Sequence, residues 1–146
     1  MSLVLDGRAY AQRLKDLLAK ELHELTSIHR PGLAIIQIGK DPASQVYVHA
    51  KLKQADAIGI SAHHFHFDES VSQSHLLDLI DSLNTDERVH GMIVQFPLPP
   101  ALDSFKILNR IRPEKDIDGL TLENVGLLIS FSGRMRFNIL DRKAHV

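Results

Sequence analysis

Three short runs rich in apolar residues alternate with segments whose apolar side chains recur every three to four positions. The strand-like runs cover residues 33–38, 62–67 and 89–96. The helix-like segments cover residues 8–28, 41–58, 72–83 and 101–111. Strands that alternate with helices predict βαβ units. We therefore expect a three-layer α/β domain, with an open, mainly parallel sheet and helices on both of its faces.

The ends of two of these helices are marked by residue type. Asp41 followed by Pro42 is typical of a helix start, with Asp41 as N-cap and Pro42 at the first helical position. Gly59 is placed to end that helix, and Ser72 is placed to cap the next one. In open parallel sheets, ligands bind beyond the carboxyl ends of the strands. The loops that follow the three strands are therefore where a site is expected.

Length, charge and composition exclude several classes of protein. The 146 residues suffice for one domain, with 44% hydrophobic and 24% charged residues. A formal net charge of −1 gives no electrostatic reason to expect nucleic acid or a membrane surface as partner. The absence of cysteine excludes disulfides, thiol nucleophiles and thiolate metal sites. No signal peptide or long apolar run is evident, so a cytoplasmic location is expected.

Two candidate site residues lie one helical turn apart. Tyr47 and Lys51 share a helix face, because residues i and i+4 are neighbours on a helix. A ring that can stack on a flat ligand then lies beside an amine that can move protons. Gln95 ends the third strand, and an acidic turn at residues 112–119 carries Asp118. All of these segments follow strands, so they are expected to meet at one edge of the sheet.

Three segments occur in the order that a known enzyme family has them. They read Ser44-Gln-Val-Tyr47-Val-His-Ala-Lys51, Val89-His-Gly-Met-Ile-Val-Gln95-Phe-Pro-Leu-Pro99 and Lys115-Asp116-Ile-Asp118-Gly119. Together they resemble the bifunctional methylenetetrahydrofolate dehydrogenase/cyclohydrolase family of one-carbon metabolism, over residues 3–130. The resemblance implies an enzyme that interconverts 5,10-methylene-, 5,10-methenyl- and 10-formyltetrahydrofolate.

The resemblance also implies roles for five residues. Lys51 and Gln95 would serve the cyclohydrolase step, in which water attacks the methenyl carbon. To act as a base near neutral pH the amine has to lose its proton, which partial burial favours. Tyr47 would stack on the folate and assist catalysis, and Asp118 and Ser44 would bind the substrate. The implied ligands are a tetrahydrofolate derivative as substrate and NADP as cofactor, with no metal.

Each of these residues also has an ordinary structural interpretation. Asp116 and Asp118 are common turn formers before a glycine such as Gly119. Gln95 could be a simple strand-end residue, and Tyr47 could be a core residue. Short motifs of this kind need structural context before a function is assigned.

Histidines at 63, 64 and 66 suggest a metal site at first sight. Alternation along a strand places His64 and His66 on one face and His63 on the other. Zinc sites take four ligands, or three and a water. No carboxylate or further histidine is placed to complete one here, so an exposed strand end is the favoured interpretation.

The cofactor half of the resembled family has no counterpart in these residues. A dinucleotide site needs a glycine-rich turn, and no two glycines here lie closer than seven positions apart. The expected domains are a folate-binding catalytic domain at 1–130 and a divergent tail at 131–146, with the NADP-binding domain missing. Dehydrogenase activity is then expected to be absent and cyclohydrolase activity to be at most residual. The alternative is a non-catalytic remnant or a binding module that self-associates as a homodimer.

Overall fold

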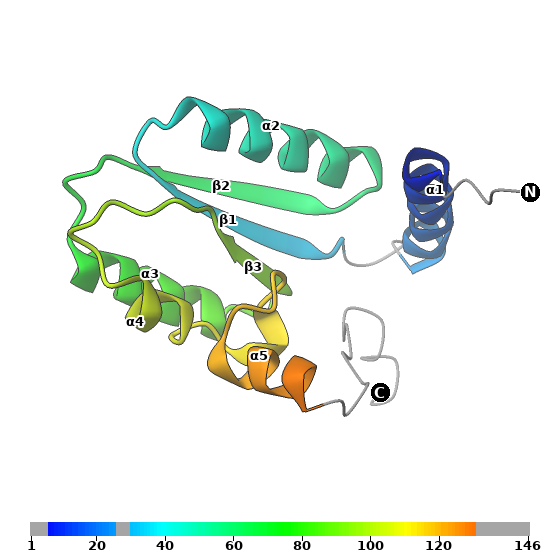
Figure 1. Ribbon diagram of the computed structural model, residues 1–146. Helices are drawn as coiled ribbons and strands as arrows, with labels where there is room; N and C mark the ends of the chain where they lie inside the picture. The colour runs from blue at the N-terminus through cyan, green and yellow to red at the C-terminus, as the bar shows by residue number, and fades with distance from the viewer. Residues whose placement is uncertain (1–5, 26–29, 131–146) are drawn as a thin grey trace, which may run out of the picture.

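The computed structural model describes residues 6–25 and 30–130, and its centre is a parallel three-stranded sheet (Figure 1). The strands are β1 (Gly32–Ile38), β2 (Ser61–Phe67) and β3 (Gly91–Val94), in the spatial order β2-β1-β3. Ile35 in the central strand pairs with His64 on one side and with Ile93 on the other. The predicted parallel sheet is confirmed.

Helices cover both faces of this sheet, as expected (Figure 1). Helix α2 (Pro42–Ala57) lies on one face, while α3 (Gln73–Thr85) and α4 (Ser104–Leu108) lie on the other. On the α2 face, the core contains Ile35, Val48 and Ile93. The core on the other face is larger, and its members include Ala34, Ile36, Leu76, Ile80, Met92 and Ile107. Successive residues of β1 and β3 therefore point to opposite faces of the sheet and contribute to two separate apolar layers.

The predicted helix caps are present. The carboxylate of Asp41 accepts from the Ser44 backbone N–H over 2.7 Å, and Pro42 follows at the helix start. Helix α2 gives way to Gly59, whose φ of 88° lies in the left-handed region that glycine adopts without a steric penalty. Ser72 accepts from the His75 backbone N–H over 3.3 Å at the start of α3. Local side-chain chemistry therefore sets these boundaries.

Several elements differ in length from their prediction. Strand β3 ends at Val94 instead of residue 96, although the Gln95 N–H still donates to the Ile36 carbonyl over 2.8 Å. Pro97 beyond it has no N–H to continue the ladder. Helix α4 covers five residues instead of the predicted 101–111. The predicted tail at 131–146 lies outside the described residues.

Helix α1 (Gly7–Leu25) confirms the predicted first helix, and residues 26–28 of that prediction lie outside the described part. Its apolar stripe is only partly covered. Leu22 is buried, but Leu14, Leu17 and Leu18 are 38–48% exposed. None of the described helices combines the length and apolar character that a membrane span requires.

Two short helices were not predicted. The turn at 112–119 contains a 3₁₀ helix, η1 (Pro113–Lys115), and is followed by α5 (Leu122–Ile129). Thr121 caps α5 by accepting from the Asn124 N–H over 3.4 Å. This Thr and the apolar spacing after it are signals of a helix, but Gly126 in the middle of α5 weakens them.

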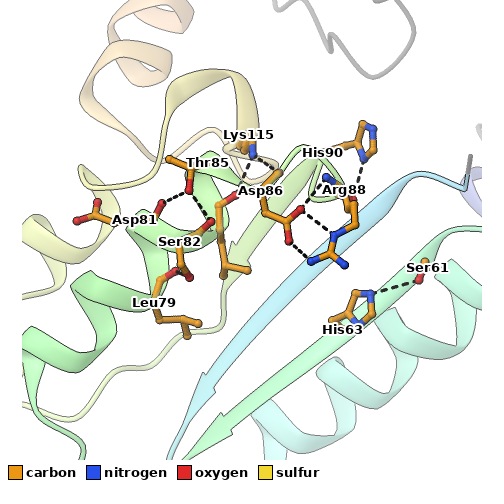
Figure 2. Close-up of polar contacts among 11 residues, drawn as sticks. Ser61, His63, Leu79, Asp81, Ser82, Thr85, Asp86, Arg88, His90 and Lys115 are labelled. Carbon is orange, nitrogen blue, oxygen red and sulfur yellow. Dashed lines mark hydrogen bonds and ion pairs between the residues drawn. The ribbon is translucent and has the colours of Figure 1, made fainter.

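Lys115 is a buried lysine that closes the end of α3. Its Nζ donates to the carbonyls of Leu83 (2.8 Å) and Asp86 (2.9 Å), and its residue is 5% exposed. The last carbonyls of a helix have no partner within it, and a cation complements their negative partial charge. Beside it, hydrogen bonds from Arg88 lower the pKa of Asp86 to about 2 (Figure 2). Through its two hydrogen bonds to the carbonyls of Leu83 and Asp86, Lys115 connects the 112–119 turn to the C-terminal end of α3.

Lys115→Met is expected to lower the free energy of unfolding by about 1–3 kcal/mol, because it leaves two carbonyl acceptors without this donor while keeping the apolar stem. Urea unfolding monitored by circular dichroism measures this change. Lys106→Met, at an exposed lysine of α4, is the matched control and is expected to change stability little. Equal stability of the Lys115 variant and the wild type would contradict the anchoring role.

Candidate active site

The centre of the candidate site is a hydrogen bond between Lys51 and Gln95. Lys51 projects from α2, and its Nζ donates to Oε1 of Gln95 over 3.1 Å. Gln95 is the first residue after β3, as predicted from its position at the strand end. Both residues are half-buried. The packing of α2 against the sheet thus brings together two residues that are 44 positions apart in the chain.

The carbonyl of Phe96 links Ser44 to this pair. Gln95 Nε2 donates to the Phe96 oxygen over 2.8 Å, and the buried Ser44 Oγ donates to the same oxygen over 3.1 Å. Lys51 Nζ is the donor in its bond to Gln95, so the carboxamide turns its oxygen to Lys51 and its nitrogen to Phe96. The Ser44 hydroxyl is engaged inside the protein, and its role in substrate binding stays a prediction.

Asp118 lies within electrostatic reach of Lys51. Partial burial raises the pKa of Asp118, the positive charge of Lys51 lowers it, and the negative charge of Asp116 raises it. The net shift is upward because loss of hydration disfavours the charged carboxylate. Within the described part of the chain, no donor hydrogen-bonds the Asp118 side chain. Its carboxylate is therefore not committed to the turn that carries it.

Asp116 differs from Asp118 in this respect. Its carboxylate accepts hydrogen bonds from the backbone N–H groups of Gly119 (3.0 Å) and Thr121 (2.8 Å) and from Asn124 Nδ2 (2.9 Å). These bonds favour the charged form and lower the pKa of Asp116 although burial opposes them. The interpretation as a turn former is therefore confirmed for Asp116.

Tyr47 lies on α2 one turn before Lys51, and its residue is 63% exposed. The interpretation of Tyr47 as a core residue is wrong, because a core ring would be covered by neighbouring side chains. An exposed aromatic ring next to a polar pair is suited to stack on a flat ligand. That role stays a prediction.

The histidines of β2 have protein partners. His64 and His66 lie on one face of the strand, with rings stacked at 5.5 Å, as their alternation predicts. Nε2 of His64 pairs with Gln37 Oε1 (3.0 Å), and Nε2 of His66 pairs with the Gly39 carbonyl (2.7 Å). Burial, and then the charge of His66, lower the pKa of His64. Among the described residues, no group of three or more metal ligands is found.

Two contributors to the site were not assigned from the sequence. The Phe96 carbonyl is a backbone group. Because every residue has such a carbonyl, the residue type does not indicate which one will accept hydrogen bonds from two side chains. Asn124 reaches Asp116 from α5, an element that was not predicted. The spacing of Asp116 to Gly119 was the signal available for the turn, and it indicates turn formation only.

Comparison with known proteins identifies the family. Residues 5–118 match the family described as "Tetrahydrofolate dehydrogenase/cyclohydrolase, catalytic domain". The match covers most of the chain, and solved structures with 32–40% sequence identity share its fold. The protein belongs to the tetrahydrofolate dehydrogenase/cyclohydrolase family.

Curated relatives and solved structures agree with this assignment. The "Bifunctional protein FolD 1/3" of Ruegeria pomeroyi is 46% identical over 127 residues, which are 86% of this chain and 43% of the relative. A bifunctional FolD enzyme from Campylobacter jejuni superposes with a TM-score of 0.82 at 40% identity, over 84% of this chain and 44% of that one. The Trypanosoma brucei enzyme, complexed with NADP cofactor and inhibitor, gives a TM-score of 0.81 at 39% identity, over 87% and 44%. The chain thus spans less than half the length of these relatives.

Proposed function

We propose that residues 1–130 form the folate-binding catalytic domain of this family and that its site hydrolyses 5,10-methenyltetrahydrofolate to the 10-formyl product. The hydrogen bond of 3.1 Å between Lys51 and Gln95 carries the proposal. It places an amine that can move a proton at the carboxyl edge of a parallel sheet, where such folds bind their ligands. Membership of the family supports the choice of substrate.

Lys51 supplies the proton transfer in this reaction. Its neutral amine takes a proton from water as the water oxygen attacks the methenyl carbon. The hydroxyl of this adduct then loses its proton and becomes the formyl carbonyl as the bond from the carbon to N5 breaks. N5 receives a proton, the formyl group stays on N10, and one proton is released to solvent overall. Gln95 orients the amine through its Oε1 and adds no charge of its own. Phe96 and Ser44 hold the Gln95 carboxamide in that orientation.

Tyr47 and Asp118 are suited to bind the folate around this centre. An offset stack of the Tyr47 ring on the pterin or on the p-aminobenzoyl ring contributes about 0.5–1.5 kcal/mol beyond area burial. The Asp118 carboxylate can accept from the donor edge of the pterin, and a charged acceptor makes the stronger hydrogen bond. The absence of an internal hydrogen-bond donor to Asp118 within the described residues favours this assignment.

NADP does not fit the described residues. A dinucleotide pyrophosphate binds to free N–H groups at a helix start that opens from a glycine-rich turn. At the start of α2, the Asp41 carboxylate already accepts from the Ser44 N–H (2.7 Å), and its negative charge would repel a phosphate. Ser72 occupies the equivalent place on α3. We therefore assign no hydride-transfer step to these residues. The cytoplasmic location is a separate point, and it stays a prediction.

Hydrolysis above the spontaneous rate tests the proposed function. The chain is expected to accelerate loss of methenyltetrahydrofolate, followed by its ultraviolet absorbance with a protein-free reaction as reference. In the same preparation, NADP-dependent oxidation of methylenetetrahydrofolate is expected to be absent. No acceleration by a folded chain would contradict the proposed hydrolysis and favour the non-catalytic interpretation.

Binding of tetrahydrofolate is expected to depend on the ionisation of Asp118. The pKa of Asp118 is raised, so its carboxylate becomes protonated, and loses the charged hydrogen bond, at a higher pH than an ordinary aspartate near pH 3.9. Affinity should therefore fall as the pH is lowered through this raised pKa. Calorimetric titration between about pH 4 and about pH 8 measures this, with Asp118→Asn as the control that lacks the transition. A transition of equal size in the variant would exclude Asp118 as its source.

Self-association is the second candidate, and α5 favours it. Leu122, Leu127, Leu128 and Ile129 on this helix are 44–71% exposed. Exposed apolar surface of this kind often marks an interface. A homodimer through α5 predicts a dimer in sedimentation velocity that Leu128→Glu dissociates. A wild-type chain that stays monomeric at all concentrations would contradict it.

A further inference from the structure

We propose that Asp116 is a positioning residue, which holds the turn so that Asp118 faces Lys51 and the folate; this inference rests on the proposed function. Asp116 does not itself contact Lys51 through any hydrogen bond of the described residues. Its effect is transmitted through the backbone of residues 117–121. Asp116 and Asp118 thus have different tasks although they are two positions apart.

The carboxylate of Asp116 closes the turn from inside. One oxygen, Oδ1, accepts from the N–H of Gly119 (3.0 Å), and the other, Oδ2, accepts from the N–H of Thr121 (2.8 Å). Asn124 adds a third donor to Oδ2 (2.9 Å) and also donates to the Pro113 carbonyl (2.9 Å). A charged acceptor shared by three donors is held more strongly than a neutral one. The backbone on both sides of Asp118 is therefore fixed by one side chain.

The sheet holds the same turn from the other side. The N–H of Ile117 donates to the Met92 carbonyl over 3.2 Å, which makes a parallel bridge between the turn and β3. Gly91 leaves the space for this approach, since a Cβ there would lie 2.4 Å from Ile117 Cδ1. Residues 116 and 117 are thereby attached to β3, and Asp118 is the first side chain beyond this attachment.

Gly119 completes the geometry of the turn. Its φ of 68° lies in the left-handed region, which reverses the chain directly after Asp118. The hydrogen bond from Gly119 to Asp116 stabilises this conformation. If the carboxylate of Asp116 were lost, residues 118 and 119 would gain backbone freedom, and the Asp118 side chain would have to be reordered on each binding event.

A double-mutant cycle tests the inference. Asp116→Asn keeps the shape of the side chain but places an N–H₂ group where two donors now point. It is expected to weaken tetrahydrofolate binding about tenfold when Asp118 is present and less than about twofold in the Asp118→Asn background. Calorimetry on the four proteins gives the coupling. Equal losses in both backgrounds would mean that Asp116 acts on the fold alone and would overturn the inference.

Two further variants keep this test decisive. Asn124→Ala removes one of the three donors to Asp116, together with the hydrogen bond to the Pro113 carbonyl, and is expected to give a smaller loss with the same dependence on Asp118. Asn109→Ala is the matched control, because it removes the hydrogen bond from the Leu122 N–H (2.8 Å) at the start of α5 without touching Asp116. It is expected to leave folate affinity unchanged. An effect of Asn109→Ala as large as that of Asp116→Asn would also overturn the inference.

Amide hydrogen exchange separates this inference from the proposed function. In Asp116→Asn the amides of Gly119 and Thr121 are expected to exchange about tenfold faster without any ligand. Unchanged exchange would overturn the positioning role whether or not folate binds. Failure of the wild-type chain to bind tetrahydrofolate, with exchange accelerated as expected in the variant, would instead refute the proposed function and leave Asp116 as the residue that orders the turn.

Discussion

Lys51→Met is expected to reduce methenyltetrahydrofolate hydrolysis by about 10²–10⁴-fold, the range that a positioned acid–base group contributes. Methionine keeps the unbranched stem of a half-buried side chain, so the fold should be retained. It removes the amine that we propose takes the proton from the attacking water. The rate constant at saturating substrate, corrected for the spontaneous reaction, measures the effect.

Lys53→Met is the matched control for this variant. Lys53 lies on the same helix two positions further along, and it is exposed. Its replacement removes the same charge from α2 without touching Gln95, so hydrolysis is expected to stay at the wild-type rate. If both variants lost activity equally, the loss would reflect the charge of α2 and not proton transfer at Lys51.

Gly32→Ala has the largest expected effect on stability. A Cβ at Gly32 would lie 1.9 Å from the carbonyl oxygen of Arg88, a backbone atom that cannot move aside as a flexible side chain does. Gly32 also accepts from the His90 N–H (2.8 Å) and donates to His90 Nδ1 (3.0 Å). The shift that relieves the clash breaks these bonds, so unfolding should become easier by about 3 kcal/mol. Urea denaturation measures the change.

Gly126→Ala is also a glycine-to-alanine substitution, but it is expected to raise the stability of the protein. Gly126 lies inside α5 with nothing within 4 Å of its added Cβ. Alanine is the better helix former, so the variant should be more stable by about 0.5–1 kcal/mol.

The outcome that would contradict the prediction for Gly32 is a Gly32→Ala protein as stable as the wild type. It would show that the strand can shift away from Arg88 without cost.

The sequence was most informative where the physical cause is local. The Asp41 cap, the start of α2 and the end at Gly59 each depend on residues within one turn of one another, and all three were predicted. The alternation of apolar runs with helical spacing likewise indicated a parallel sheet covered on both faces. Helix α5 was missed because Gly126 lowers the helical propensity of an otherwise apolar segment.

Contacts between distant segments were decided by the tertiary structure. The strand order β2-β1-β3 places β3 next to β1, and α2 returns over that face, so Lys51 meets Gln95. The meeting of Lys51 and Gln95 at one edge of the sheet was expected from the sequence, but the double use of the Phe96 carbonyl was not. The same holds for Asp116 and Asp118, which look alike in the chain. Side-chain chemistry is local, whereas the partner of each group depends on strand order and register, which emerge only when the whole sheet packs.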